Sequence, residues 1–388
     1  MMGPTRSGEE PKDLTPEDQA GNERGLAGRT PLIVNIQLLR FLAALAVVLF
    51  HAQPVFSPGV KGGAASIGFG GVDVFFVISG FIMWYTTRGM QGPAHAGWFV
   101  RRRFARIFSG YWPYLFIAWV LLAIFEPQQL ARKSLLESIL LLPIPIGDRI
   151  LQVSWTLTFE LWFYLLFALL ICLPRHWMGR LVVWLVLLLV LLNGVGVAAL
   201  GFYDASFFGS VPPSLRLMIS PYVVEFLAGC LVARAFMAGF RLSPLFSLIL
   251  AAAFFAAGWL YDEQVLGGGL DQGYHVVERV LFFGTGSVAL VYAMAEFERR
   301  GLRVWPLLGR WLGGASYSLY LSHTLLFFLV LHLPLDAERQ ESWFMLIAVV
   351  LVTAYSLLHY RWIEQPFYGL MKTWLGAAST RVESTDDC

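Results

Sequence analysis

The sequence has few charged residues and few cysteines, and it lacks the motifs of several common protein classes. Only 14% of its 388 residues are charged, whereas soluble chains contain about 25%. The three cysteines, Cys172, Cys230 and Cys388, form no CxxC pair, so the sequence supports neither a disulfide framework nor a zinc site, and we expect no metal. There is no phosphate-cradling glycine loop and no basic arm for nucleic acid, so we expect no nucleic-acid partner.

Apolar residues dominate instead. They make up 57% of the chain, and the mean hydropathy is +0.64. This composition predicts an all-α, polytopic membrane helix bundle without a soluble catalytic domain. We count ten segments long enough to span a bilayer: 32–52, 70–87, 110–126, 157–173, 181–201, 217–237, 243–261, 276–296, 313–333 and 342–363.

The remaining segments are polar or short. Residues 1–30 are rich in Gly, Pro, Glu and Asp and predict a disordered cytosolic tail rather than a signal peptide. The membrane domain is expected to cover 31–367, followed by a cytosolic C-terminal tail over 368–388. The apolar piece Leu135–Leu142 is too short to span, so we interpret it as re-entrant or interfacial. If it did span, the topology after it would invert.

The distribution of basic residues orients the bundle. With a cytosolic N-terminus, most of the 28 Lys and Arg residues fall in cytosolic segments, whereas outside loops carry mainly Asp and Glu. This agrees with the positive-inside rule and places both termini in the cytosol. We find no internal repeat, which counts against a transporter built from two related halves.

The first span carries two polar residues on one face. Arg40 and His51 are eleven residues apart, which corresponds to about 1100° of helical rotation and a separation of about 16 Å along the axis. An arginine within an apolar helix is costly, so it indicates a functional site. The alternative is a structural arginine that binds the helix-end carbonyls of a neighbouring span.

Two carboxylates are expected near the depth of His51, because Asp73 and Glu160 each lie close to the outer end of a span. A carboxylate there would orient the His51 ring and stabilise its charged form. The alternative for Asp73 is a simple helix cap.

Further polar residues lie in or beside the spans. In the expected loop FVRRRFARIF, Arg103 and Arg106 lie three residues apart and suit the phosphates of a nucleotide-like donor, although anionic lipid headgroups are an alternative ligand. Within the ninth span, His323 is either catalytic or structural. The other candidate residues of a cavity or acceptor site are Tyr317, Tyr320 and Glu225. Glu278 and Arg279 are further candidates, with a simple pair at the interface as the alternative. Glu364 is interpreted as part of a structural helix end at the cytosolic edge, and the alternative places it at the mouth of a donor site.

The ordered motifs IQLLRFLAALAVVLFHA, GGVDVFFVISGF, RRRFARI, SWTLTFELWFYLL, ASYSLYLSH and WIEQPF extend over 36–367. This set resembles the acyltransferase-3 family of multipass membrane O-acyltransferases. The family's arginine–histidine signature falls on Arg40 and His51, and its paired arginines fall on Arg103 and Arg106. Two departures are that Glu160 stands alone where two glutamates are common, and that Ser322 stands where tryptophan is common. IQLLR and VISGFIMWY resemble the exopolysaccharide O-acetyltransferase branch.

The resemblance implies transfer of an acetyl or other short acyl group from acyl-CoA to a sugar hydroxyl, in the cytoplasmic membrane of a bacterium. The implied acceptor is a glycan or lipid-linked oligosaccharide, and acetyl-CoA is a co-substrate rather than a tightly bound cofactor. In this interpretation His51 is the base or acyl carrier, Asp73 and Glu160 support it, and Arg40, Arg103 and Arg106 bind the donor. Lipopolysaccharide, peptidoglycan or a small glycosylated molecule are alternative acceptors. A flippase with Arg40, Glu225 and His323 along its path, and a non-catalytic scaffold, are the alternatives outside enzymology. The sequence does not indicate the oligomeric state.

Overall fold

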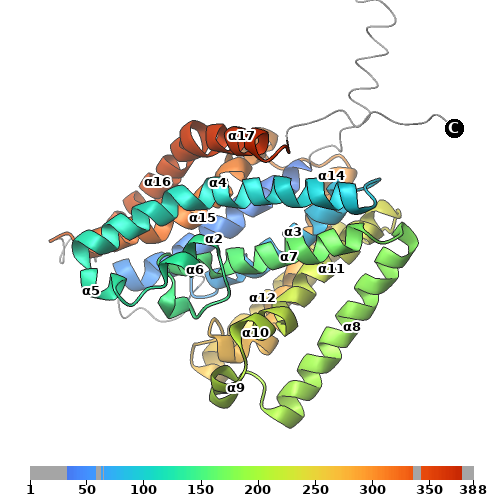
Figure 1. Ribbon diagram of the computed structural model, residues 1–388. Coiled ribbons are helices and arrows are strands. Elements are labelled where there is room, and N and C mark those ends of the chain that lie inside the picture. The colour runs from blue at the N-terminus through green and yellow to red at the C-terminus, as the bar shows by residue number, and fades with distance from the viewer. Residues whose placement is uncertain (1–32, 58–62, 64, 335–341, 378–388) are drawn as a thin grey trace, which may run out of the picture. The chain divides into compact units, whose positions relative to one another are not determined.

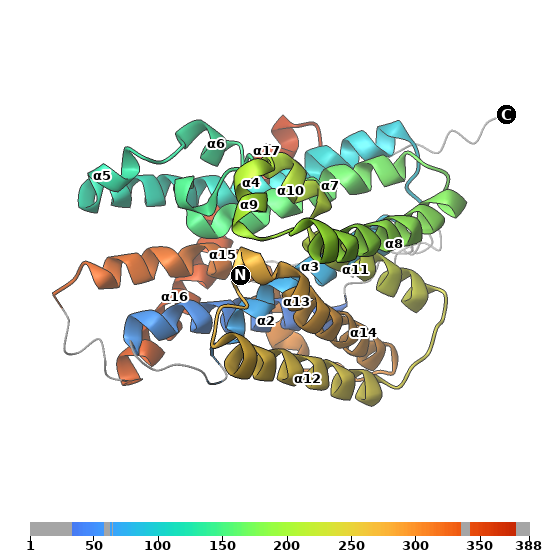
Figure 2. The same ribbon diagram turned by 90° about the horizontal axis from the view of Figure 1, so that it is seen from below.

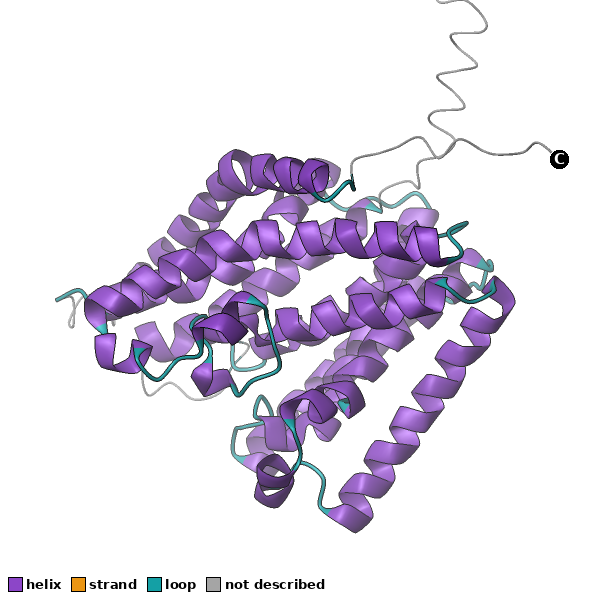
Figure 3. Cartoon of the chain, viewed as in Figure 1, coloured by secondary structure: helices purple, strands orange, loops and turns teal. Residues whose placement is uncertain are grey.

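The computed structural model describes residues 33–57, 63, 65–334 and 342–377. The described residues form helices joined by loops, with no strand among them (Figure 3). Ten of these helices are long and apolar enough to cross a membrane, so the predicted all-α polytopic architecture and the predicted number of spans are confirmed. The expected N-terminal tail lies outside the described residues.

The long helices are α2 (Val34–Phe56), α3 (Gly71–Thr86), α4 (Pro93–Phe125), α7 (Trp155–Ile171), α8 (Arg175–Leu200), α11 (Pro221–Met237), α12 (Pro244–Tyr261), α14 (Thr285–Arg299), α15 (Pro306–Leu331) and α16 (Ser342–His359). The short helices are α5 (Pro127–Leu130), α6 (Leu135–Ile139), α9 (Ala205–Ser210), α10 (Pro213–Ile219), α13 (Val276–Arg279) and α17 (Gln365–Trp374). Because α17 continues the last span, the beginning of the expected C-terminal tail is helical; residues 378–388 lie outside the described part.

The arginine-rich segment predicted as a loop is helical. Helix α4 begins at Pro93, well before residue 110, and runs without a break to Phe125. Gly92 has a φ of 88° and Pro93 occupies the first turn, and this pair starts a helix because proline is preorganised for the first helical position. The arginines therefore lie on the first half of a membrane-spanning helix.

The segment predicted to be re-entrant or interfacial contains α6, a helix of five residues. At about 1.5 Å per residue it is far too short to cross a bilayer. It rests on α4, since the Tyr111 hydroxyl donates to the Ser138 carbonyl at 2.7 Å and the Trp112 indole donates to the Ile139 carbonyl at 3.2 Å.

Helix α2 lies inside the bundle and packs against α3, α14 and α15 (Figure 1). Helix α12 lies beside α14 (Figure 2).

Helix α8 differs from the buried α2, because most of its large apolar side chains are exposed, among them Trp184, Leu188 and Leu191. In a membrane protein, a helix with such an exposed apolar surface is suited to face lipid.

Helices α3 and α11 approach each other closely through glycine. A Cβ added at Gly80 would lie 1.8 Å from the Phe226 carbonyl oxygen, and one at Gly229 would lie 2.0 Å from the Val77 carbonyl oxygen. Small residues at a crossing of membrane helices allow this contact between backbones. The pair of glycines therefore determines how closely the middle of α3 approaches α11.

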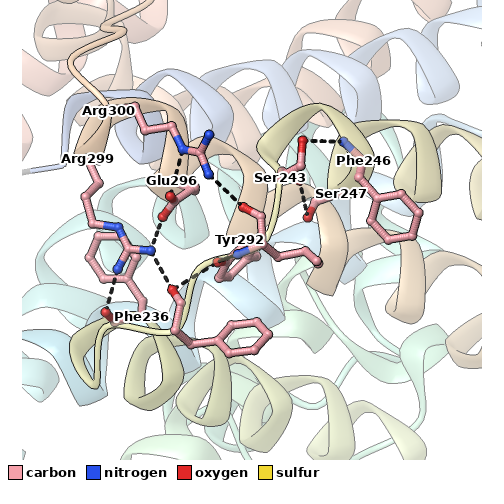
Figure 4. Close-up of polar contacts among 10 residues, drawn as sticks. Phe236, Ser243, Phe246, Ser247, Tyr292, Glu296, Arg299 and Arg300 are labelled. Carbon is pink, nitrogen blue, oxygen red and sulfur yellow. Dashed lines mark hydrogen bonds and ion pairs between the residues drawn. The ribbon is translucent and has the colours of Figure 1, made fainter.

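A polar cluster at the end of α14 fixes the turn between α11 and α12 (Figure 4). The buried Glu296 carboxylate forms ion pairs with both Arg299 and Arg300. Arg299 donates to the Phe236 carbonyl at 2.9 Å, and Arg300 donates to the Leu242 carbonyl at 3.2 Å. The cluster satisfies a carbonyl at the end of α11 and a carbonyl of the turn that follows it, neither of which has a helical partner.

Candidate active site

Helix α2 carries Arg40 and His51, and its first turn is anchored to the end of α14. The backbone N–H of Asn35 donates to the Glu298 carboxylate at 2.8 Å, and the Asn35 side chain donates to the Leu302 carbonyl at 2.9 Å. The Asn35 side-chain oxygen accepts from the Val304 N–H at 2.8 Å. Because Asn35 is fully buried, these bonds fix the position of the helix that holds both candidate residues.

Arg40 faces a cavity of about 180 Å³ that also receives Arg103 and Arg106. We call it the arginine cavity. The prediction that these three residues act together is consistent with this placement, since α2 and α4 bring their guanidinium groups to one space. The other polar residues that line it are Gln37, Ser79, Thr156, Glu160, Tyr164, Tyr317 and Tyr320.

The three guanidinium groups have different partners. Arg106 forms an ion pair with Glu364 and lies over the Tyr317 ring, 5.5 Å from its centroid. Arg103 lies over the ring of Tyr164 at 5.6 Å, and Arg40 donates to the Gln37 side chain at 3.2 Å. Within the described part of the chain, no carboxylate lies within ion-pair distance of Arg40 or Arg103, so both keep donors for an anionic ligand.

His51 lines a second cavity, of about 510 Å³, which we call the histidine cavity. Its wall includes Phe50, Phe69 and Trp155, together with residues of the 126–154 segment that follows α4. The charged residues that line it are Glu126, Lys133, Asp271 and Arg279. Apolar rings with a rim of polar groups are typical of a site for an organic ligand.

The side chain that contacts the polar edge of the His51 ring is a second histidine, on α15. His51 Nδ1 lies 2.9 Å from the Val47 carbonyl oxygen and 3.3 Å from Nε2 of His323. The His323 side chain is fully buried and does not line the histidine cavity, so it lies behind His51. The sequence identified His323 as a candidate but did not predict this contact.

The two cavities adjoin. Val72 and Tyr320 line both of them. The Tyr320 hydroxyl donates to the Val153 carbonyl at 3.0 Å and accepts from the Thr156 hydroxyl at 2.9 Å, which holds the ring between them. Tyr317, one turn earlier on α15, lines only the arginine cavity. Helices α2 and α15 therefore each present residues to both cavities.

The predicted contact between Asp73 and His51 is wrong. Asp73 is fully buried and accepts from Arg279 at 3.1, 3.0 and 2.6 Å, and Arg279 also donates to the Phe69 carbonyl at 3.1 Å. A planar guanidinium binds a carboxylate through two parallel bonds, which an imidazole cannot match. The side chain of Asp73 does not cap its helix either. Arg279, predicted as a further candidate or as a simple partner of Glu278, lines the histidine cavity.

Two glutamates, Glu160 and Glu225, also differ from their predicted places. Glu160 lines the arginine cavity and accepts from the Tyr164 hydroxyl, so it does not share a site with His51. Its position on α7 directs it toward the guanidinium groups. Glu225 is buried beside Asp73 and lines neither cavity. The predicted convergence of His51, Asp73 and Glu160 is therefore wrong.

Glu364 was predicted to belong to a structural helix end, with the mouth of a donor site as the alternative. It is fully buried and accepts from Arg106 and, at 2.7 Å, from the Ser318 hydroxyl. It ends a π-helical turn, Tyr360–Glu364. Such turns often occur at functional sites, and the motif WIEQPF was the only signal in the sequence.

The 126–154 segment, which covers part of the histidine cavity, is held by a buried arginine. Arg149 donates to the Leu142 carbonyl at 3.0 Å and to the Ile144 carbonyl at 3.3 Å. Burial lowers the pKa of Arg149 to about 10, so the side chain stays charged near neutral pH. This guanidinium therefore links residues 142–144 to residue 149 within the segment.

Comparisons with known proteins place the chain in a family. The sequence profile of an acyltransferase domain, acyltransferase-3, matches residues 33–361. The chain is 32% identical to the exopolysaccharide production protein ExoZ of Rhizobium meliloti over 330 residues, which cover 82% of this chain and 94% of the relative. It is 24% identical over 378 residues to the peptidoglycan O-acetyltransferase OatA of Listeria monocytogenes, covering 86% of this chain and 55% of OatA. No solved structure gives a significant match.

Proposed function

The chain belongs to the acyltransferase-3 family, and we propose that it transfers an acetyl group from acetyl-CoA to a hydroxyl group of an exopolysaccharide. It is a multipass membrane acyltransferase of the exopolysaccharide O-acetyltransferase-like branch. One observation carries the proposal. A single helix presents Arg40 to one cavity and His51 to the cavity beside it, with Val72 and Tyr320 between them.

The arginine cavity is suited to the donor. Acetyl-CoA carries several phosphate charges, and arginine is the side chain best matched to phosphate oxygens. Arg103 and Arg40 keep guanidinium N–H groups that form no ion pair, and Glu364 neutralises Arg106. The cavity therefore keeps a net attraction for an anion. We assign Arg103 and Arg106 to the phosphates and Arg40 to the pantetheine or thioester region.

The histidine cavity is suited to the acceptor. Its aromatic walls can pack against sugar rings, and its carboxylate, amide and ammonium side chains can bind sugar hydroxyls. His51 lies in its wall, so a hydroxyl bound there can reach the imidazole. The thioester has to extend past Tyr320 and Val72, because Arg40 and His51 are about 16 Å apart along the helix.

The chemistry requires one proton carrier. His51 takes the proton from the acceptor hydroxyl as that oxygen attacks the thioester carbonyl. The carbon–sulfur bond of the tetrahedral intermediate then breaks. The CoA sulfur leaves with the proton that His51 held, which gives an acetyl ester and free CoA. Because Asp73 binds Arg279, it holds that guanidinium at the cavity wall rather than orienting His51.

The topology of this proposal follows the positive-inside rule. Both termini lie in the cytosol of a bacterial cell, and the first half of α4 faces the cytosolic acyl-CoA pool. The histidine cavity lies toward the opposite surface, where surface glycans are assembled. The similarity to OatA makes peptidoglycan the second candidate acceptor.

The test is the acetyl content of surface glycans, measured by NMR in a wild-type strain, a deletion strain and complemented deletion strains. We expect acetate on one glycan to disappear on deletion and to return with the intact protein but not with His51→Ala. The sugar that changes identifies the acceptor. Unchanged glycans in all strains would refute a surface-glycan acceptor, and failure of the purified protein to bind acetyl-CoA would then refute the acyltransferase mechanism.

A further inference from the structure

Among the described residues, no carboxylate forms a hydrogen bond or an ion pair with His51, although a catalytic histidine is commonly oriented by one. Asp73 is bound by Arg279, and Glu160 lies in the arginine cavity. The ring that does contact His51 is His323, with ring centroids 5.0 Å apart. The His323 ring packs between the rings of Tyr320 and Phe327, with a distance of 5.9 Å between ring centroids in each case.

The positions of the protons on this pair follow from the groups around it. His323 Nδ1 lies 3.3 Å from the Leu319 carbonyl oxygen. A carbonyl oxygen can only accept, so Nδ1 of His323 carries the hydrogen and its Nε2 carries a lone pair. That lone pair faces His51 Nδ1, which also lies 2.9 Å from the Val47 carbonyl oxygen.

The same reasoning fixes the tautomer of His51. Two acceptors, the Val47 carbonyl and His323 Nε2, converge on its Nδ1. A lone pair on that nitrogen would repel both of them, so Nδ1 carries the hydrogen and donates to the pair. The lone pair of neutral His51 is therefore on Nε2, the nitrogen available to a substrate hydroxyl.

We propose that His323 is a positioning residue for the acetyl transfer: its Nε2 accepts the Nδ1 hydrogen of His51, holds His51 in the tautomer whose Nε2 is the base, and stabilises the imidazolium that forms. This inference rests on the proposed function. A neutral imidazole does here what a carboxylate does in a serine hydrolase. In this buried place it avoids the large cost of desolvating a second charge.

Three substitutions separate this role from packing. In His323→Gln the side-chain oxygen reaches the place of Nε2 and can still accept from His51. In His323→Asn the amide reaches only the place of Nδ1, so it is a matched polar control that cannot contact His51. His323→Leu removes both polar atoms.

The measurement is transfer of labelled acetyl from acetyl-CoA to surface glycan isolated from a strain that lacks the gene, with kcat and KM for acetyl-CoA determined separately. We expect His323→Asn and His323→Leu to lower kcat on the order of 100-fold, which is the lower end of the rate contribution of a general base. We expect KM for acetyl-CoA to stay within about 3-fold of the wild-type value, since only an interaction in the transition state is affected. We expect His323→Gln to keep most of kcat.

Equal losses in Gln and Asn, or a wild-type kcat in Asn, would overturn the role of His323 while leaving acyl transfer intact. If the wild-type protein transferred no acetyl group to any glycan fraction, the proposed function would fail, and the role of His323 would fail with it. Should Leu not fold, the comparison of Gln with Asn decides the question alone.

Discussion

Arg106 on α4 is ion-paired with Glu364, which lies 258 residues later in the chain. The Glu364 side chain is fully buried, whereas 25% of the Arg106 side chain is exposed, toward the arginine cavity. Glu364 thus joins the last span to the wall of the proposed donor site. A buried carboxylate can only be kept charged by such a partner.

Loss of this carboxylate should therefore destabilise the protein. We expect Glu364→Ala to lower the free energy of unfolding by about 3 kcal/mol, the lower end for breaking a buried ion pair, because Arg106 retains access to the cavity. Thermal unfolding of the detergent-solubilised protein measures the effect. Ser318→Ala is the control, since it removes only a neutral donor to the same carboxylate and should cost about 1 kcal/mol. Equal stability of the two variants would contradict the structural role of Glu364.

Arg103→Ala should weaken acetyl-CoA binding, because Arg103 faces the arginine cavity and no carboxylate in the described chain lies within ion-pair distance of it. A lost charge-assisted hydrogen bond of about 1.5–3 kcal/mol corresponds to about a 10- to 100-fold increase in Kd. Isothermal titration of the purified protein with acetyl-CoA measures it. Arg101 is the matched control, since it lies two residues earlier on the same helix, is exposed and does not line the cavity. If Arg101→Ala weakens binding as much as Arg103→Ala does, the arginines act through general charge and not through this site.

The parts of the molecule that depend on local chemistry could be predicted from the sequence. The ten spans follow from long apolar runs, and the shared face of Arg40 and His51 follows from helical geometry. Arg103 and Arg106 fall in one cavity because residues three apart on a helix are neighbours. The start of α4 was misplaced because arginines every few residues reduce the mean hydropathy while the helix continues.

The pairing of distant residues could not be predicted. His323 follows His51 by 272 residues, and Arg279 follows Asp73 by 206. No periodicity connects such positions, because the packing of whole helices brings them together. Depth in the membrane placed Asp73 and Glu160 at the level of His51, but depth does not specify which face of a neighbouring helix a side chain occupies. For the same reason, the sequence suggested only the neighbouring Glu278 as a partner of Arg279.

His51→Ala should abolish acetyl transfer and leave acetyl-CoA binding within about 3-fold of wild type, since His51 lines the histidine cavity and not the arginine cavity. Loss of a general base reduces kcat by about 100- to 10,000-fold. Transfer of labelled acetyl to isolated glycan and titration with acetyl-CoA measure the two effects on one protein sample. Normal transfer by this variant would eliminate His51 as the base, and lost binding together with lost transfer would indicate that the bundle itself is damaged.

The Asp73–Arg279 pair separates the sequence-based role of Asp73 from the role that its contacts indicate. Asp73→Leu leaves the buried Arg279 guanidinium without its carboxylate, and Arg279→Met leaves the buried carboxylate without its guanidinium. Each single variant should lose about 3–5 kcal/mol of unfolding free energy.

The double variant Asp73→Leu/Arg279→Met buries neither charge. It should therefore be more stable than either single variant, with a coupling energy of at least about 2 kcal/mol in a double-mutant cycle of thermal unfolding. If Asp73 acted on His51 instead, replacing Arg279 as well could not recover stability, and the two losses would add. Additive losses would thus contradict the pairing, whereas recovered stability would assign Asp73 to holding Arg279 at the wall of the histidine cavity.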